Sequence, residues 1–64
     1  MRNDIRDRRA ETDESQADLA AAVGVTRQTI NAIERERYDP SLELAFELAD
    51  HFGCRIEDIF EPAE

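Results

Sequence analysis

Apolar side chains recur every three or four residues along most of this chain, which is the spacing of an α-helix with one buried face. Leu19 and Val23 share one such face, and Ile30 and Ile33 share another. No stretch of alternating β-branched and polar residues is long enough to indicate a strand. The pattern therefore predicts a compact all-α domain with helices at residues 3–12, 16–23, 27–36, 42–52 and 56–60.

The predicted helix boundaries carry the residue types that helix ends favour. Hydroxyl side chains that can accept a hydrogen bond from an unpaired backbone N–H precede three of the helices, at Ser15, Thr26 and Ser41. Gly24 and Gly53 follow two of them, and glycine adopts the left-handed conformation of a helix end without steric cost. Residues 16–36 thus form a helix, a short turn containing glycine and a second helix, which is the helix-turn-helix unit.

The chain of 64 residues suffices for a single domain with one small core. The one cysteine, Cys54, excludes an intramolecular disulfide and a multi-cysteine metal site, and we expect it in the core. No apolar run reaches the length of a membrane span, and the N-terminal segment lacks the apolar stretch of a secretory signal, so we expect a cytoplasmic protein. No arrangement of Ser, His or Cys indicates a nucleophile, and nothing indicates an enzyme, a cofactor, a metal or a small-molecule ligand.

Charge is distributed unevenly between the two halves of the chain. The formal net charge is −8, and all eight basic residues are arginines. Residues 1–37 hold seven of the arginines and a net charge of −1, whereas residues 38–64 hold one arginine and a net charge of −7. A strongly acidic surface maintains solubility, and together with the absence of lysine it indicates adaptation to a salty cytoplasm. The arginines are nevertheless kept in the half that contains the helix-turn-helix unit.

The second helix of the unit carries side chains that can read DNA. Arg27 can donate two hydrogen bonds to guanine O6 and N7, and Gln28 or Asn31 can bond to adenine N6 and N7. Such a helix fits the major groove with its first residues against the base edges. Gln16 stands at the start of the preceding helix, where unpaired N–H groups attract phosphate. Double-stranded DNA is therefore the expected partner, and we expect the acidic Glu34 to be bonded within the protein.

A longer joint pattern runs through residues 15–60. It consists of Ser15-Gln16, Leu19-Ala20, Gly24-Val25-Thr26, Thr29-Ile30, Glu34 and Tyr38-Asp39-Pro40-Ser41. This pattern resembles the Cro/repressor-type helix-turn-helix family, with its lambda-repressor-like fold, and most of all its small stand-alone regulators. The resemblance implies a dimeric DNA-binding transcriptional regulator. The residues that it implies at the DNA are Gln16 at a phosphate, Arg27 and Gln28 at the bases with Thr26, Thr29 and Asn31 beside them, and Arg35, Arg37 and Tyr38 at the backbone.

Three positions depart from that family's usual pattern. Arg8 and Glu14 stand where the family usually has apolar residues, which leaves Ile5 and Ala10 as the apolar residues of the first helix. An Arg8–Glu14 ion pair at the surface would add only about 0–1 kcal/mol. Arg55 stands where the last helix is often capped by serine.

The helix predicted at residues 42–52 has an apolar arc of about 200°, which is wider than one core usually requires. Either it is a central helix packed among the other four, or part of the arc contacts a second copy. We favour a homodimer whose interface contains Leu44, Phe46, Leu48, Ile59 and Phe60. Two recognition helices would then read a short palindrome, and we expect a repressor. The alternative is a protein-interaction module, such as an antitoxin-like partner, that acts through the last two helices.

Overall fold

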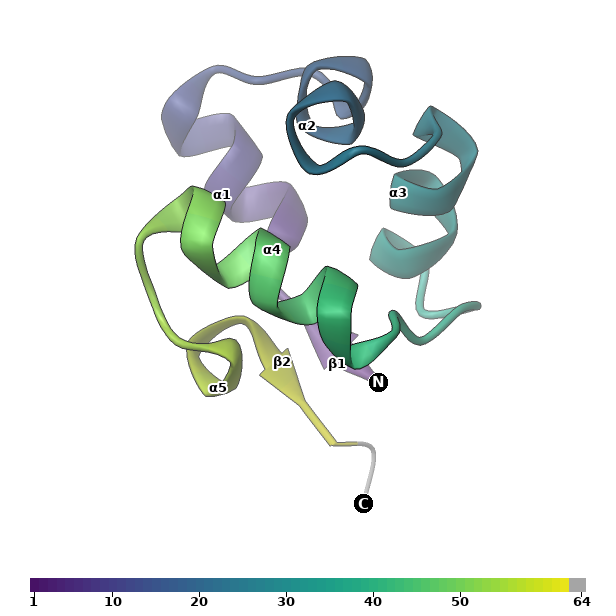
Figure 1. Cartoon of the computed structure of the whole chain (residues 1–64), viewed down its shortest axis with the longest axis vertical. Helices are drawn as coiled ribbons and strands as arrows, with labels where there is room; N and C mark the ends of the chain where they lie inside the picture. Colours follow the sequence, from purple (N-terminus) through teal and green to yellow (C-terminus); the bar gives the residue numbers. More distant parts are fainter. Residues whose placement is uncertain (63–64) are drawn as a thin grey trace.

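Five helices and two short strands follow one another in the computed structural model, which describes residues 1–62. They are β1 (Arg2–Asn3), α1 (Ile5–Thr12), α2 (Gln16–Val23), α3 (Arg27–Glu34), α4 (Leu42–Phe52), α5 (Ile56–Ile59) and β2 (Phe60–Glu61). In Figure 1, α4 lies in the middle, with α2 above it, α3 to its right, and α5 and the strands below it. The predicted five-helix fold is confirmed. Within residues 1–62, none of the helices is long and apolar enough to cross a membrane.

The predicted hydroxyl caps hold the first turns of three helices. At α2, the Ser15 hydroxyl accepts a hydrogen bond from the Asp18 N–H at 2.9 Å, and the Asp18 carboxylate accepts one from the Ser15 N–H at 3.1 Å. The hydroxyls of Thr26 and Ser41 each accept a bond from the N–H three residues later, at 3.2 and 3.1 Å. These bonds satisfy donors that the start of a helix leaves unpaired, so local chemistry determines where α2, α3 and α4 begin.

The two ends of the described chain pair as a short antiparallel sheet, which the sequence pattern did not predict. The register places Arg2 opposite Glu61 and Asn3 opposite Phe60. The first helix consequently begins at Ile5 and not at residue 3. Asn3 bridges two elements, because its Nδ2 donates to the Ile33 carbonyl at 2.9 Å while its Oδ1 accepts from the Ile5 N–H at 3.2 Å. Strands of two residues are too short to show an alternating pattern.

Two helices are shorter than predicted at their C-terminal ends. Helix α3 ends at Glu34 and does not reach residue 36, because Glu36 has a left-handed backbone with φ of 61°. A residue in this conformation stops a helix, and the Arg37 N–H then donates back to the Ala32 carbonyl at 2.9 Å. Helix α5 ends at Ile59 because Phe60 has an extended backbone and enters β2.

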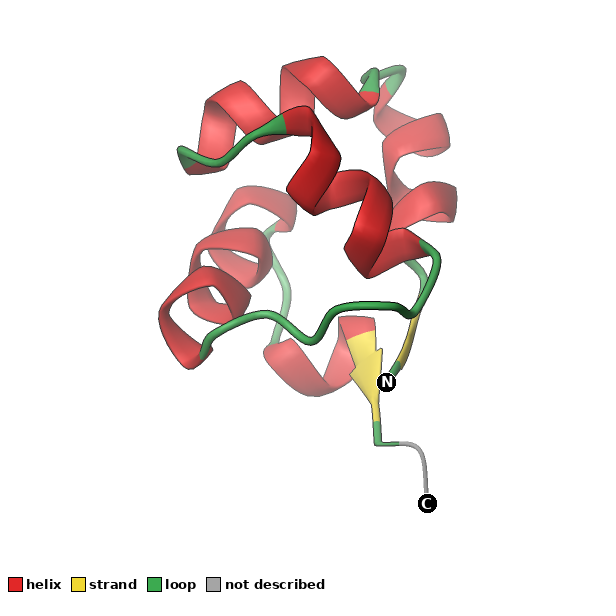
Figure 2. Cartoon of the chain, turned by 90° about the vertical axis from the view of Figure 1, so that its right-hand side faces the viewer, coloured by secondary structure: helices red, strands yellow, loops and turns green. Residues whose placement is uncertain are grey.

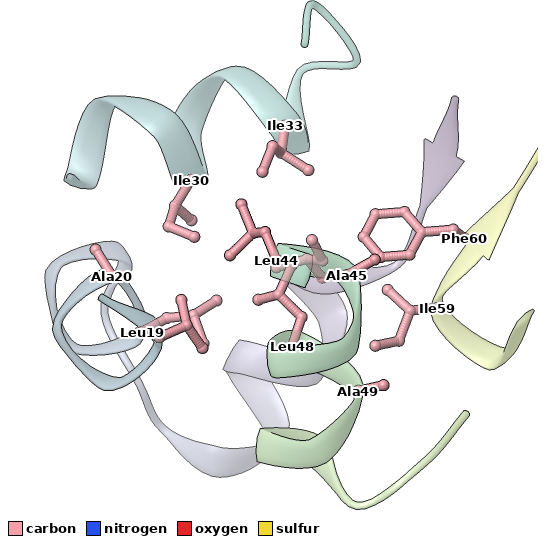
Figure 3. Close-up of a cluster of buried hydrophobic side chains, with 12 residues drawn as sticks. Leu19, Ala20, Ile30, Ile33, Leu44, Ala45, Leu48, Ala49, Ile59 and Phe60 are labelled. Carbon is pink, nitrogen blue, oxygen red and sulfur yellow. The ribbon is translucent and has the colours of Figure 1, made fainter. Parts of the chain in front are cut away.

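One hydrophobic core joins the five helices and β2. Figure 3 shows side chains of α4 at the centre of this cluster, between α2 and α3 on one side and the segment of Ile59 and Phe60 on the other. Within α1 only Ile5 is buried, and Ala10, which was expected to be buried with it, is exposed. Cys54 is partly buried against the core, in agreement with its prediction. The large side chains with no significant exposure are Ile5, Leu19, Ile30, Ile33 and Leu48.

The two polar residues at positions that the family usually keeps apolar do not pair with each other. Arg8 Nε donates to Asp4 Oδ1 at 2.9 Å, one helical turn earlier, and this bond raises the pKa of the Arg8 guanidinium. Glu14 Oε2 lies 2.8 Å from His51 Nε2, so Glu14 connects the α1–α2 loop to the end of α4. Arg8 Nη2 also donates to the Asp58 carbonyl of α5 at 3.2 Å, so a side-chain bond to another element helps to hold α1 where apolar contacts are few.

The structure corrects the expected dimer surface. Four of its five residues lie in the core of the subunit itself: Leu44, Leu48, Ile59 and Phe60. Helix α4 is therefore a central helix, as in the other interpretation of its wide apolar arc. Its residues Leu44, Ala45, Leu48 and Ala49 are buried in the core. The fifth residue, Phe46, is 59% exposed, and Leu42 one turn earlier is 69% exposed. The apolar surface that α4 offers to a partner is therefore much narrower than the sequence pattern indicated.

Candidate nucleic-acid interface

The turn between α2 and α3 determines how α3 is presented. Gly24 ends α2 with φ of 76°, and the Val25 N–H donates to the Ala20 carbonyl at 3.0 Å. Ile30 on the inner face of α3 belongs to the same buried cluster as Leu19 and Ala20 of α2. In Figure 1, α2 is seen along its axis while α3 runs down the right-hand side, so the two helices cross as in a helix-turn-helix unit.

Helix α3 divides its side chains between the core and the surface. Ile30 and Ile33 are buried, whereas Arg27 and Gln28 at the start of the helix and Arg35 just after its end are exposed. The view in Figure 2 brings α3 to the front of the molecule. The side chains predicted to read bases are therefore available to a partner that approaches α3.

Two adjoining hollows connect these side chains with α1 and α2. The first has a volume of about 200 Å³ and is lined by Gln16, Arg27, Gln28 and Asn31. The second, which we call the α1–α3 hollow, has a volume of about 300 Å³ and is lined by Arg6, Arg9, Gln16, Asn31, Glu34 and Arg35. Gln16 and Asn31 line both hollows, so the two form one continuous region, which we call the recognition surface.

Hydrogen bonds fix the polar side chains of this surface. Arg9 donates from Nε to Glu34 Oε2 at 2.6 Å and from Nη2 to Glu34 Oε1 at 3.1 Å. Gln16 Nε2 donates to Glu34 Oε1 at 3.1 Å, and Asn31 Nδ2 makes a weaker, 3.5 Å bond to Gln16 Oε1. The bond to Glu34 raises the pKa of the Arg9 guanidinium. Glu34 is therefore bonded within the protein, as expected, and its charge is balanced there.

Two residues of this surface, Arg6 and Arg9, were missing from the set predicted to contact DNA. Both lie on α1, three residues apart and hence on neighbouring positions of one helix face. That spacing was readable in the sequence. What the sequence did not indicate is that this face of α1 lies against Gln16 and Glu34 from two other helices.

Two of the predicted DNA-contacting residues do not line the recognition surface. Thr29 and Tyr38 line a separate hollow of about 360 Å³, which Glu43 and Glu47 also line. The Thr29 hydroxyl lies 3.0 Å from the Thr26 hydroxyl, and the ring of Tyr38 is half exposed. Acidic side chains repel phosphate, so this second hollow is a poor site for the DNA backbone.

Salt bridges separate the arginines of residues 1–62 into two groups. Arg2, Arg8 and Arg9 pair with Glu61, Asp4 and Glu34. The arginines without a salt bridge in this part of the chain are Arg6, Arg27, Arg35, Arg37 and Arg55. Three of them, Arg6, Arg27 and Arg35, line the recognition surface. Positive charge that the protein does not neutralise itself is thus concentrated there, although the chain as a whole is acidic.

Comparison with known protein families matches residues 5–59 to a helix-turn-helix family. The chain belongs to the Cro/repressor-type helix-turn-helix family. Over 60 residues, this helix-turn-helix protein is 55% identical to an HTH-type transcriptional regulator of Methanocaldococcus jannaschii, and the match covers 94% of this chain and 91% of that protein. It is 45% identical over 60 residues to the HTH-type transcriptional regulator YgzD of Bacillus subtilis, which covers 94% of this chain and 91% of YgzD.

A more distant relative has a more specific name. The transcriptional repressor RstR of the cryptic phage CTXphi, from Vibrio cholerae, is 35% identical over 60 residues, which cover 94% of this chain and 54% of RstR. The resemblance and the fold class predicted from the sequence are both confirmed by these matches. Membership in the family implies DNA binding and a role in transcription regulation.

Proposed function

We propose that this helix-turn-helix protein is a sequence-specific transcriptional repressor that binds a short palindrome as a homodimer. The observation that carries the proposal is the exposure of Arg27 and Gln28 at the start of α3, in one hollow with Gln16 and Asn31. The first residues of a recognition helix are those that reach base edges in the major groove.

Each side chain in this hollow has a matching partner on DNA. The guanidinium of Arg27 suits guanine O6 and N7, and the amides of Gln28 and Asn31 suit adenine N6 and N7. Gln16 uses one amide hydrogen for Glu34, and its amide nitrogen carries a second hydrogen that can bond a phosphate. A phosphate contact of this kind fixes the register in which Arg27 and Gln28 meet the bases.

The remaining predicted contacts flank this region. Arg35 and Arg37 follow α3 and provide positive charge for the backbone. Thr26 and Thr29 lie at the N-terminal end of α3, beside the base-reading residues. The half-exposed Tyr38 would touch the backbone at the edge of the interface with its exposed surface, and not through the acidic hollow that it lines.

A second copy would complete the reading of a palindrome. Phe46 is exposed beside a hollow of about 630 Å³ whose apolar lining includes Ala49, Cys54 and Ile56. In a two-fold dimer the same contact occurs twice, so Phe46 of each subunit can insert into the hollow of the other subunit. The two α3 helices would then face half-sites about 34–36 Å apart.

Repression is the mode of regulation that we propose. The named function of RstR as a repressor supports it, since that relative matches along 94% of this chain. A dimer that covers two half-sites in a promoter blocks access to the DNA between and around them. The acidic second half of the chain suits a position away from the duplex.

The test is binding to DNA selected from a random pool, together with a duplex from immediately upstream of the protein's own gene. Fluorescence anisotropy would compare the enriched duplex with a scrambled one. We expect Arg27→Ala/Gln28→Ala to weaken binding to the enriched duplex by about 30-fold or more, since two lost base contacts cost at least about 2 kcal/mol. Binding to the scrambled duplex should change much less.

Arg2→Ala is the matched control, because it removes one arginine that is paired with Glu61 in the terminal sheet. It should leave the preference for the enriched duplex unchanged. Selection that enriches no sequence, or a preference that survives in the Arg27→Ala/Gln28→Ala variant, would contradict base reading by α3.

A further inference from the structure

Arg55 is the only arginine in the acidic second half of the chain, residues 38–64. It precedes α5, and its backbone N–H donates to an Asp58 carboxylate oxygen at 3.0 Å, so the start of α5 does not depend on the Arg55 side chain. That side chain is exposed and forms no salt bridge within residues 1–62, although this half of the chain holds eight acids. Its charge is therefore available to another molecule.

Arg55 lines the hollow beside Phe46, which we call the α4–α5 hollow. The other lining residues are Ala49, Asp50, Cys54, Ile56, Glu57 and Phe46 itself. In Figure 1 the chain leaves the C-terminal end of α4 and returns beneath this helix as α5, so the hollow lies between the second half of α4 and the start of α5. An apolar lining that suits an aromatic ring is thus combined with a cation that has no salt bridge in the described chain.

The face of α4 that carries Phe46 has the opposite charge. Glu43 precedes Phe46 by three residues and Asp50 follows it by four, so both are its neighbours on the helix surface. Both acids are exposed, and neither forms a salt bridge within residues 1–62. Each copy of the chain therefore offers an aromatic ring flanked by acids and a hollow that contains an arginine, which makes the surface complementary to itself, as a two-fold contact requires.

The geometry of a two-fold contact selects Glu43 as the partner of Arg55. Insertion of Phe46 into the α4–α5 hollow places the ring against Ala49 and Asp50 of the other copy, so the axis passes close to the middle of α4. When the two α4 helices lie antiparallel across this axis, the residues one turn before Phe46 meet the residues that follow α4 in the other copy. Glu43 lies in the first of these segments and Arg55 in the second.

We propose that Arg55 pairs with Glu43 of the second copy and thereby determines with which chains this protein associates. This inference rests on the proposed homodimer and identifies the charged contact that makes it specific. Without Arg55, the contact would bring together the acids of two α4–α5 surfaces, and like charges repel. Phe46 supplies the apolar contact, and Arg55 is the specificity-determining residue.

A charge swap tests the pairing. Arg55→Glu and Glu43→Arg should each weaken self-association about tenfold, because each replaces two exposed ion pairs per dimer by two contacts between like charges. The double variant Arg55→Glu/Glu43→Arg should associate like the native protein, because both pairs are restored with their charges exchanged. Sedimentation equilibrium without DNA would measure the dissociation constants. About 1 M salt should remove most of the loss in the single variants, because the screening length is then only about 3 Å.

A mixture of the two single variants provides the sharper test. In a dimer of one Arg55→Glu chain and one Glu43→Arg chain, both contacts join opposite charges, whereas a dimer of either variant with itself joins like charges. Equal amounts of the two should therefore form more mixed dimer than random pairing gives. Native mass spectrometry would measure this, because the two variants differ in mass. A role of Arg55 in folding alone would not produce such a preference.

Arg6→Glu is the matched control, because it makes the same change of charge at an exposed arginine of α1 that has no salt bridge in the described chain. Its dissociation constant should stay within about twofold of the native value. Arg55→Lys should retain most of the native affinity, because lysine keeps the charge. Circular dichroism would check that each variant folds.

The outcomes separate this inference from the proposed function. If the native protein dimerises through Phe46 but the mixture shows no preference for the mixed dimer, or Arg55→Glu associates like Arg6→Glu, the Arg55–Glu43 pair is refuted and the proposed dimer stands. If the native protein is a monomer that still prefers the enriched duplex, the pair and the homodimer are both refuted, while base reading by α3 stands.

Discussion

At the scale of single residues, two ion pairs of the same chemical type have very different surroundings. The side chains of Arg9 and Glu34 are 15% and 6% exposed, whereas those of Arg2 and Glu61 are 68% and 65% exposed. Water and salt screen the exposed pair, so it contributes little to folding. In the covered pair, removal of one partner leaves a charge with few water contacts, which is costly.

We expect Arg9→Met to lower the free energy of unfolding by about 3 kcal/mol, because Glu34 then keeps a covered negative charge without its guanidinium partner. Urea unfolding followed by circular dichroism at a fixed protein concentration measures this. Arg2→Met should cost less than about 1 kcal/mol. If the two variants are equally stable, the Arg9–Glu34 pair does not hold α1 against α3.

The double variant Arg9→Met/Glu34→Leu should recover most of that loss, since apolar residues of similar volume often replace a covered pair without penalty. The titration of Arg9 should not change the contribution of the Arg9–Glu34 pair to stability near neutral pH. The bond raises the pKa of Arg9, so its contribution is present below the unfolded-state pKa of arginine and is lost only in strongly alkaline solution.

At the scale of elements, residues with a left-handed backbone conformation determine where a helix ends and in which direction the chain continues. Gly24 ends α2 at φ of 76°, and Gly53 ends α4 at φ of 69°. Asp13 after α1 and Glu36 after α3 have the same left-handed backbone conformation, although neither is a glycine. At Gly24 this conformation turns the chain into α3, so it connects a local backbone preference to the presentation of the recognition surface.

We expect Gly24→Ala to lower the free energy of unfolding by about 1 kcal/mol, because alanine pays for the left-handed conformation that glycine adopts freely. An added Cβ would meet no atom of residues beyond its chain neighbours within 4 Å, so a clash with the packed core is not the cause. Gly24→Asn should cost less, since asparagine tolerates this region better. Thermal unfolding of the two variants tests this, and an asparagine variant that is less stable than the alanine variant would point to a steric cause.

At the scale of the whole molecule, the chain closes on itself and leaves one apolar side of α4 uncovered. The β1–β2 pairing joins the two ends of the described chain, and the Glu14–His51 bond joins the α1–α2 loop to α4. Ile59 and Phe60 are buried by this closure, while Phe46 remains 59% exposed. Self-association, if it uses α4, must therefore use Phe46 and its neighbours.

We expect Phe46→Glu to weaken self-association by about 30-fold, because a central aromatic contact is commonly worth about 2 kcal/mol. Sedimentation equilibrium would measure the dissociation constant. Tyr38→Glu is the matched control, since that ring is exposed to a similar extent, 50%, on another part of the surface. A native protein that stays monomeric, or a Phe46→Glu variant that associates like Tyr38→Glu, would contradict the proposed dimer.

The sequence alone determined the features that depend on residues a few positions apart. The helical repeat of Ile30 and Ile33, the cap at Thr26 and the glycine at residue 24 together predicted α3, its start and its outward side chains Arg27 and Gln28. These follow from hydrogen bonds and helical periodicity within one or two turns, which a linear pattern contains.

Tertiary structure alone decided the features that join distant residues. The Arg9–Glu34 pair spans 25 positions and the Arg2–Glu61 pair spans 59, and Arg6 and Arg35 line one hollow although they belong to distant parts of the chain. The wide apolar arc of α4 was compatible with either a partner or a central position, and the burial of Leu44 and Leu48 in the core of the subunit itself decided for the central position. Periodicity shows how much of a helix must be covered, but only the folded chain determines what covers it.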